Sequence, residues 1–425
     1  MDGTLKNGSL LVSDSGNRYK VIRLLGAGGQ GEVYEVERGS ERAALKWYFP
    51  KMATLSQKKI LEKLVAKGAP DDAFLWPEDM LTQGLGNSLG YVMKLRPKEY
   101  KGIVDMMKRR AEPSFSALCT AAFKLTRGYQ KLHSLGYSYR DISFGNVFLN
   151  PDTGNILICD NDNVSASGDD NSSVYGTPRF MAPEIVVGTA LPSRNTDLYS
   201  LSVLLFYMFM LHHPLEGKRE ADIKCMDIFA MMMLFGKNPV FIFDPDDGSN
   251  RPVKGYQDNA IIYWSIYPQF LKDLFTTAFT VGLTHPNRRI TENQWLGALS
   301  NLMSQITACP KCGADAFADV GNCWACGSTV PDLPVLTIER RKVVLSPDIR
   351  IYSHHIYGDF DIDSIAGCVV RNPNNPDILG IRNETDKPWV YIKTDGTQVS
   401  IAPGKSAAIT KGTKLDFGKS TGEIS

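Results

Sequence analysis

One segment of the sequence, residues 139–146, constrains the rest of the chain more than any other. It reads YRDISFGN and follows an apolar, helix-like run. Two short apolar runs come next, and Asp160 closes the second of them. The pattern predicts a short strand pair with Asp141 and Asn146 before it and Asp160 after it. Such a site suits a carboxylate that faces a substrate hydroxyl while an amide and a second carboxylate hold a divalent cation.

Length and composition set broad bounds. The 425 residues are enough for two or three domains, and 43% apolar with 22% charged residues is typical of a globular protein. The net charge of +1 favours neither nucleic acid nor an anionic membrane as partner. The most apolar stretch, residues 198–211, falls short of the roughly 20 residues of a membrane span, so we expect a buried helix there. Residues 10–12 are too short for a signal core, and the cysteine usage fits a reducing compartment, so we expect a cytoplasmic protein.

A glycine-rich turn lies near the N-terminus. Residues 20–36 are predicted to form two strands around the sequence GAGGQG, which contains Gly26, Gly28 and Gly31. Glycines let backbone N–H groups approach phosphates. A G-x-G-x-x-G pattern alone is weak, but here a strand follows it, whereas a dinucleotide-binding fold requires a helix. Lys46 then lies near the end of a third predicted strand.

Taken together, these motifs resemble the eukaryotic-type (Hanks-type) serine/threonine protein kinases, of the kind found in bacteria. Residues 139–146 resemble the catalytic loop, and residues 43–46, AALK, resemble the strand with the phosphate-binding lysine. Residues 176–184, GTPRFMAPE, resemble the end of the activation segment. The resemblance implies that Asp197 anchors the catalytic-loop backbone and that Arg289 pairs with Glu184.

The resemblance, which covers residues 17–305, implies a bilobal protein-kinase fold of the α+β class that uses ATP with Mg²⁺ or Mn²⁺. It makes Asp141 the base that orients the acceptor hydroxyl. Asn146 and Asp160 would be the ligands of the divalent cation. Lys46 would bind the α- and β-phosphates and would be held by Glu62 on the next helix. The positions implied around the nucleotide are Leu25, Gly26, Gly28, Gly31, Val33, Ala44, Lys46 and Met93.

Three departures from the family pattern bear on activity. Tyr139 replaces a mainly structural histidine. Ser143 replaces a lysine that contacts the γ-phosphate, so we expect slow transfer. Residues 160–162 read DND instead of DFG, which keeps the metal-binding aspartate and loses the phenylalanine and the glycine. Asp162 is expected to bind metal or to orient the loop.

The loop over residues 163–176 is rich in Ser, Asp and Gly and is predicted to be exposed. We expect autophosphorylation on at least one of its serines, with Arg140 as the partner of the phosphate. Thr177 is expected instead to hydrogen-bond Asp141. The candidate serines are Ser165, Ser167, Ser172 and Ser173.

Two C-x-x-C pairs follow residue 306, and a glycine comes after each. Four thiolates at this spacing suit a structural Zn²⁺, and the motif resembles a zinc ribbon. The alternative of two redox pairs lacks the surrounding βαβ pattern. The segment between the pairs is acidic, which favours a spacer or protein contact over nucleic-acid binding. The ligands would be Cys309, Cys312, Cys323 and Cys326.

Short apolar runs separated by Asn, Asp, Pro and Gly predict a small all-β sandwich or barrel at the C-terminus. We expect this domain to be a protein-interaction module. Residues 412–418 faintly resemble the last strands of forkhead-associated domains, which bind phosphothreonine, but the signature residues of that family are missing in the expected order. Phosphopeptide binding therefore ranks lower, and His354 and His355 are expected at the surface. The expected organisation is a disordered tail (1–16), N-lobe (17–96), C-lobe (97–305), zinc ribbon (306–330) and all-β domain (331–425).

Three functions are consistent with this sequence. The first is an ATP- and Mg²⁺-dependent protein kinase, favoured because Lys46, Asp141, Asn146 and Asp160 are all present. The second is a pseudokinase scaffold that binds nucleotide and partner proteins without transfer. The third is a phosphotransferase for small molecules, which the complete activation-segment ending disfavours. For the first, the resemblance implies protein substrates and a cognate metal-dependent phosphatase as partners, with neither nucleic acid nor membrane.

Overall fold

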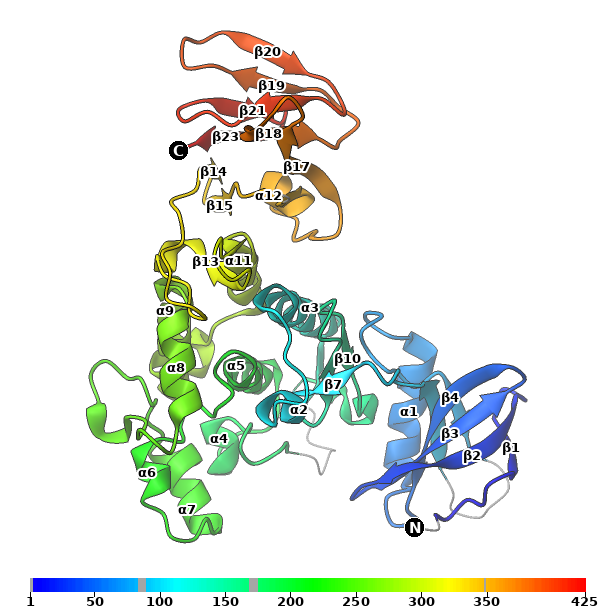
Figure 1. The fold of residues 1–425 in the computed structure, drawn as a ribbon. Helices are drawn as coiled ribbons and strands as arrows, with labels where there is room; N and C mark the ends of the chain where they lie inside the picture. The colour runs from blue at the N-terminus through cyan, green and yellow to red at the C-terminus, as the bar shows by residue number, and fades with distance from the viewer. Residues whose placement is uncertain (1–2, 83–88, 168–174, 348) are drawn as a thin grey trace. The chain divides into compact units, whose positions relative to one another are not determined.

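The computed structural model describes residues 3–82, 89–167, 175–347 and 349–425 (Figure 1). The chain forms two compact units, each continuous in space but not in sequence. The first unit comprises Met1–Pro113, Thr120–Tyr263 and Leu274–Asn293, and the second comprises Ser114–Cys119, Trp264–Asp273 and Gln294–Ser425. This partition differs from the domain boundaries predicted from the sequence, which stay predictions.

The first unit begins with a six-stranded antiparallel sheet in the order β1-β2-β3-β4-β6-β5. Side chains alternate between its faces, as the period of a strand requires. Tyr34 and Leu45 belong to one apolar cluster, while Ala44 and Met93 belong to a second, together with Leu61 of the helix α1. The elements are β1 (Leu10–Val12), β2 (Arg18–Ala27), β3 (Gly31–Arg38), β4 (Glu41–Tyr48), α1 (Leu55–Lys67), β5 (Asp79–Leu81) and β6 (Gly90–Lys94).

The N-terminal residues are ordered, so the prediction of a disordered tail over residues 1–16 is wrong for residues 3–16. β1 pairs with β2 at the sheet edge. Leu5 is buried, and its N–H donates to the Tyr34 hydroxyl at 3.0 Å. The polar composition of this segment did not indicate order, because the order comes from one buried leucine and from strand pairing with β2.

The remainder of the first unit is mainly helical. α5 is buried along nearly its whole length, as predicted for residues 198–211. Within the described part of the chain, no helix is long and apolar enough to cross a membrane. The elements that follow β6, up to the ribbon, are β7 (Lys101–Gly102), α2 (Ile103–Met107), α3 (Phe115–Ser134), β8 (Tyr137–Ser138), β9 (Val147–Leu149), β10 (Ile156–Ile158), η1 (Asn161–Asn163), β11 (Ser165–Ala166), α4 (Pro183–Val186), α5 (Arg194–Met210), α6 (Lys218–Ala221), α7 (Ile228–Met232), η2 (Met233–Lys237), η3 (Gly248–Asn250), α8 (Asp258–Ile266), α9 (Gln269–Phe279), α10 (Val281–Thr284), η4 (Pro286–Arg288) and α11 (Glu292–Met303).

The second unit contains the paired cysteines. The hairpin of β12 (Ile306–Ala308) and β13 (Asp315–Phe317) precedes the short helix η5 (Ala318–Val320). Phe115, at the start of α3, stacks on Phe317 with ring centroids 5.1 Å apart and contacts Trp324 at 5.5 Å. Tyr267 lies 5.5 Å from Phe317. These rings join the cysteine-containing segment to the first turn of α3.

An all-β region ends the second unit, as the sequence predicted. One sheet has the order β15-β14-β23-β22-β19-β20 and the other β16-β17-β18-β21. Leu336 and Leu415 of the first sheet share one buried cluster with Val369 and Ile381 of the second. The elements are β14 (Val335–Ile338), β15 (Arg341–Val344), β16 (Arg350–Tyr352), α12 (Ser353–Tyr357), β17 (Ile365–Asn372), β18 (Asn375–Asn383), β19 (Trp389–Ile392), β20 (Gln398–Ile401), β21 (Ser406–Ala408), β22 (Lys414–Asp416) and β23 (Thr421–Ile424).

The prediction that His354 and His355 are surface residues is wrong. Both are buried, and through Nε2 they bond Ser300 of α11 at 2.7 Å and Ser304, directly after that helix, at 2.8 Å. Their Nδ1 atoms accept backbone N–H groups, from Phe360 and Tyr352 respectively. An accepting Nδ1 requires the neutral ring, so Nε2–H donates to the serine hydroxyl.

We expect acid to weaken this unit through these two histidines. Burial lowers the pKa of His354 to about 4 and that of His355 to about 3. Because both lie below the unfolded value of about 6.5, the stabilisation is complete above pH ~6.5 and is lost as pH falls toward ~3. At pH 5 the loss is on the order of 2 kcal/mol per histidine. Urea unfolding at pH 7 and pH 5 measures it: the double variant His354→Gln/His355→Gln loses this pH slope, and His285→Gln, at an exposed histidine, keeps it.

Candidate active site

The glycine-rich turn, residues 26–31, comprises the end of β2, the three residues that follow it and the first residue of β3. A Cβ at Gly31 would lie 2.2 Å from the Trp47 carbonyl oxygen, so close packing requires this glycine. A Cβ at Gly26 or Gly28 would meet nothing within 4 Å. Packing therefore does not explain those two glycines, whereas the approach of an anion to the backbone does.

The apolar positions predicted around a nucleotide lie mostly together. Ala44 and Met93 are buried and share a cluster with Val33. Leu157 of β10 packs against the same cluster, although nothing in its sequence pattern distinguishes it from any other strand leucine. Leu25 is 39% exposed and is not part of this cluster.

Lys46 is buried, and its ammonium faces two carboxylates. The Nζ atom lies 2.8 Å from Asp162 Oδ2 and 3.5 Å from Asp160 Oδ1. It also donates to Gln30 Oε1 at 3.0 Å, and Gln30 belongs to the glycine-rich turn. Burial alone would lower the pKa of Lys46, but the charges of Asp162 and Asp160 outweigh it and raise that pKa. The lysine is therefore charged and fully hydrogen-bonded.

The predicted pairing of Lys46 with Glu62 is not found. Glu62 lies 4.0 Å from Lys58 on the same helix, with about half of its side chain exposed. Helix α1 instead contributes Gln57, whose Nε2 donates to the Asp162 carbonyl at 2.9 Å. The two carboxylates that face Lys46 belong instead to Asp160 and Asp162, in the segment after β10. Asp162 is completely buried there.

The catalytic-loop segment is anchored as predicted. Asp197 accepts the backbone N–H of Tyr139 at 2.6 Å and that of Arg140 at 3.0 Å. His133 Nε2 contacts the same carboxylate at 3.0 Å, and its Nδ1 contacts Glu292 at 2.5 Å. Burial lowers the pKa of His133, but hydrogen bonds to Asp197 and Glu292 outweigh it and raise that pKa to about 9. A protonated His133 thus neutralises buried carboxylates behind the loop.

Asp141 accepts hydrogen bonds at all three of its oxygen atoms. Thr177 Oγ1 donates to Asp141 Oδ1 at 2.7 Å, which confirms the predicted contact. Asn146 Nδ2 donates to the Asp141 carbonyl at 2.9 Å and lies 3.4 Å from Oδ2. The Tyr139 hydroxyl contacts the Cys159 carbonyl, directly before Asp160. The tyrosine that replaces the usual histidine therefore links the two acidic segments.

Asp160 and Asn146 lie on adjoining backbone. The Cys159 N–H donates to the Asn146 carbonyl at 2.9 Å. Burial raises the pKa of Asp160, Lys46 opposes this, and the nearby charges of Asp162 and Asp141 add to the increase. The Asp160 side chain is 43% exposed and the Asn146 amide uses its nitrogen for Asp141. A carboxylate and an amide oxygen are thereby available to a hard cation, which fits the predicted divalent-metal pair.

The end of the activation segment is tied to the helical part of the first unit. Arg289 donates to both oxygens of Glu184 at 2.7 Å, which confirms the predicted pair. Ser165 is buried in β11, whereas Ser167 is exposed and accepts the Arg194 N–H at 3.0 Å. Ser172 and Ser173 lie outside the described residues.

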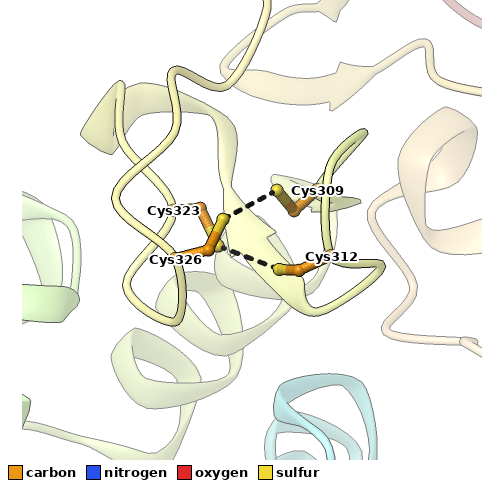
Figure 2. Close-up of side chains that lie close together, drawn as sticks. All are labelled: Cys309, Cys312, Cys323 and Cys326. Atoms are coloured by element: carbon orange, nitrogen blue, oxygen red, sulfur yellow. Dashed lines mark hydrogen bonds between the residues drawn. The ribbon is translucent and has the colours of Figure 1, made fainter.

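The four cysteines of the second unit converge (Figure 2). Their sulfur atoms lie within 4.8 Å of one another, with Cys309–Cys326 and Cys312–Cys323 both at 3.7 Å. A tetrahedral zinc with Zn–S bonds of about 2.3 Å separates its sulfurs by ~3.8 Å. The four-cysteine cluster therefore fits a zinc ribbon.

Both cysteine turns have the same backbone. The Gly313 N–H donates to the Cys309 carbonyl, and the Gly327 N–H donates to the Cys323 carbonyl. Gly313 and Gly327 have φ of 73° and 71°, a conformation that glycine adopts without strain. The glycine after each C-x-x-C is thus required by the turn that directs two thiols inward.

Comparison with known proteins agrees with this geometry. Residues 86–294 match the family model described as "Protein kinase domain". The chain is 26% identical over 215 residues to the probable serine/threonine-protein kinase CCRP1 of Zea mays, covering 49% of this chain and 33% of the relative. It is 27% identical over 237 residues to the serine/threonine-protein kinase PknD of Chlamydia pneumoniae, covering 48% and 25%. It is 23% identical over 324 residues to the protein kinase YegI of Escherichia coli (strain K12), covering 72% and 48%. The chain thus spans between a quarter and about half of the length of these relatives.

Proposed function

Because this chain carries a protein kinase domain, we propose that it transfers the γ-phosphoryl group of ATP to Ser/Thr hydroxyls of proteins. The observation that carries the proposal is the setting of Asp141. Its carboxylate accepts hydrogen bonds from the Thr177 hydroxyl and the Asn146 amide. The backbone N–H of the preceding residue, Arg140, donates to Asp197. A carboxylate fixed in this way can orient an acceptor hydroxyl and take its proton.

The other residues of the site bind and neutralise charge. We propose that Lys46 binds the α- and β-phosphates and that the turn at Gly26 and Gly28 approaches the same phosphates. Asn146 and Asp160 would hold Mg²⁺, which neutralises the negative charge that develops on the transferred group. Ser143 is buried and adds no positive charge, so transfer is slow: a missing donor of this kind costs on the order of 3 kcal/mol.

Mg²⁺-ATP and mass spectrometry test this proposal. The unaltered protein is expected to gain at least one phosphoryl group, and Ser167 is the exposed candidate among the described serines. Ser167→Ala is expected to remove its share of the added mass, whereas Ser165→Ala, at a buried hydroxyl, leaves the mass gain unchanged. A protein that labels neither itself nor a generic protein acceptor contradicts the proposal.

The alternative is a pseudokinase scaffold that binds nucleotide without transfer. It is favoured by the Gln30 side chain, which occupies a donor of Lys46 and also donates to Asn163 Oδ1 at 3.2 Å. Binding of Mg²⁺-ATP with no mass gain distinguishes this alternative from the kinase.

We also propose that the four-cysteine cluster holds one structural Zn²⁺, since all four ligand positions are filled by thiols. The pattern of free cysteines is consistent with a reducing compartment such as the cytoplasm. A cognate metal-dependent phosphatase would reverse the modification.

A further inference from the structure

The buried ammonium of Lys46 has an inner and an outer partner. The inner one is Asp162, whose side chain is 0% exposed and whose two oxygens lie 3.0 and 2.8 Å from Nζ. The outer one is Asp160, whose side chain is 43% exposed and whose nearest oxygen lies 3.5 Å away. A buried charge requires a counter-charge, and only the inner carboxylate is shielded enough from solvent to supply a strong one.

Asp162 is itself held in place from several sides. The Tyr48 hydroxyl contacts its carboxylate. Gln57 donates to its carbonyl at 2.9 Å and to the Tyr48 hydroxyl at 3.3 Å. The residue before it, Asn161, donates to the Leu75 and Ile158 carbonyls. Side chains and backbone therefore fix the acidic residue that faces Lys46.

Helix α1 offers no comparable acid. Glu62 points to Lys58 with 52% of its side chain exposed. From α1 the neutral side chain of Gln57 reaches only the Asp162 backbone carbonyl and the Tyr48 hydroxyl among the residues that the structure describes. The charge that orients the lysine thus comes from the segment after β10, 116 residues away in sequence.

We propose that Asp162 is the positioning residue for Lys46 in phosphoryl transfer, in place of an acid on helix α1. The inference rests on the proposed kinase function. In this arrangement Asp162 stays on the inner side of the ammonium, and phosphate would bind on the outer side by displacing Gln30, whose Oε1 accepts from Nζ at 3.0 Å. The orientation of Lys46 then depends on the D-N-D segment and not on Glu62.

The test compares Asp162→Asn, which keeps the shape and removes the charge, with Glu62→Gln. Asp162→Asn is expected to lower kcat for autophosphorylation about 100-fold, by analogy with loss of one preorganised electrostatic contact. KM for ATP is expected to change less than about 5-fold, because the phosphates retain their other contacts. Glu62→Gln is expected to retain the rate within about 2-fold.

A rescue variant separates positioning from folding. Asp162→Glu keeps a carboxylate at this position, and we expect its kcat to exceed that of Asp162→Asn by at least about 10-fold. A full rate in Asp162→Asn overturns the inference. So does a loss of about 10-fold or more in Glu62→Gln, a surface change that leaves folding intact even if Asp162→Asn does not fold. Absence of transfer in the unaltered protein is a different result: it overturns the proposed function, and the inference with it.

Discussion

Replacing Asp141 with alanine is expected to abolish detectable phosphoryl transfer and to leave nucleotide binding in place. Loss of a general base lowers rates by about 100- to 10,000-fold. The side chain bonds Thr177 and lies near Asn146, whereas the proposed phosphate contacts come from Lys46 and the glycine-rich turn. The expected result is therefore a fall in kcat without a matching rise in the Kd for Mg²⁺-ATP, measured by single-turnover labelling and by calorimetry.

Two further variants serve as controls for this prediction. Thr177→Val removes the hydroxyl that donates to Asp141 and is expected to give an intermediate loss of kcat, because the carboxylate remains but is less well oriented. Asp160→Ala is expected to weaken Mg²⁺-dependent binding and transfer together, since it removes a proposed metal ligand. If Asp141→Ala labels itself as the unaltered protein does, the labelling does not depend on this site and the scaffold function is the better explanation.

Contacts between motifs of fixed chemistry could be predicted from the sequence. Asp197 holds the catalytic-loop backbone, Arg289 pairs with Glu184, and Thr177 bonds Asp141, all as expected. These polar groups are buried or partly buried, so each needs a specific partner, and the motifs supply both members of each pair. The strands around the glycine-rich turn could also be predicted from the sequence, because alternating apolar residues and turn glycines are local signals.

The partner of Lys46 could not be predicted in the same way. Residues 160–162 depart from the family pattern, so the motif gave no reason to pair Asp162 with a lysine 116 residues earlier. Glu62 is the acid on the helix after the lysine strand, but its side chain lies beside Lys58 and is 52% exposed. Sequence spacing does not reveal which acid is buried opposite a given lysine when two or three compete.

Two further predictions, the disorder of residues 3–16 and the exposure of His354 and His355, were wrong because tertiary contacts order or bury these residues. Leu5 and β1 are ordered by Tyr34 and the existing edge of the sheet, which a polar, glycine-containing segment does not show by itself. His354 and His355 are buried against two serine hydroxyls, that of Ser300 on α11 and that of Ser304 directly after the end of that helix. The i, i+4 spacing of the two serines predicts such contacts only if it is already known that residues 300–304 pack against residues 354–355.

Removal of one proposed zinc ligand is expected to have the largest effect on stability. In Cys323→Ser the thiolate cluster loses a buried member, so the metal is lost and residues 306–330 unfold. Structural zinc in small domains supplies on the order of 10 kcal/mol of folding free energy, because the unfolded chain has no preformed site. Phe317 and Trp324 would then leave Phe115, exposing the first turn of α3 to solvent within the same unit.

Elemental analysis and thermal unfolding measure this effect. The unaltered protein, purified without chelator, is expected to contain about one Zn²⁺ per chain, and Cys323→Ser or Cys309→Ser close to none. Cys225→Ser is the matched control, since Cys225 is exposed and lies outside the cluster, and it is expected to retain the metal. Nucleotide binding is expected to persist in the ligand variants, because Lys46 and the glycine-rich turn belong to the other compact unit. Unaltered protein with no bound metal, or a Cys323→Ser variant with unchanged zinc content and melting temperature, contradicts the assignment of these four thiols as a zinc site.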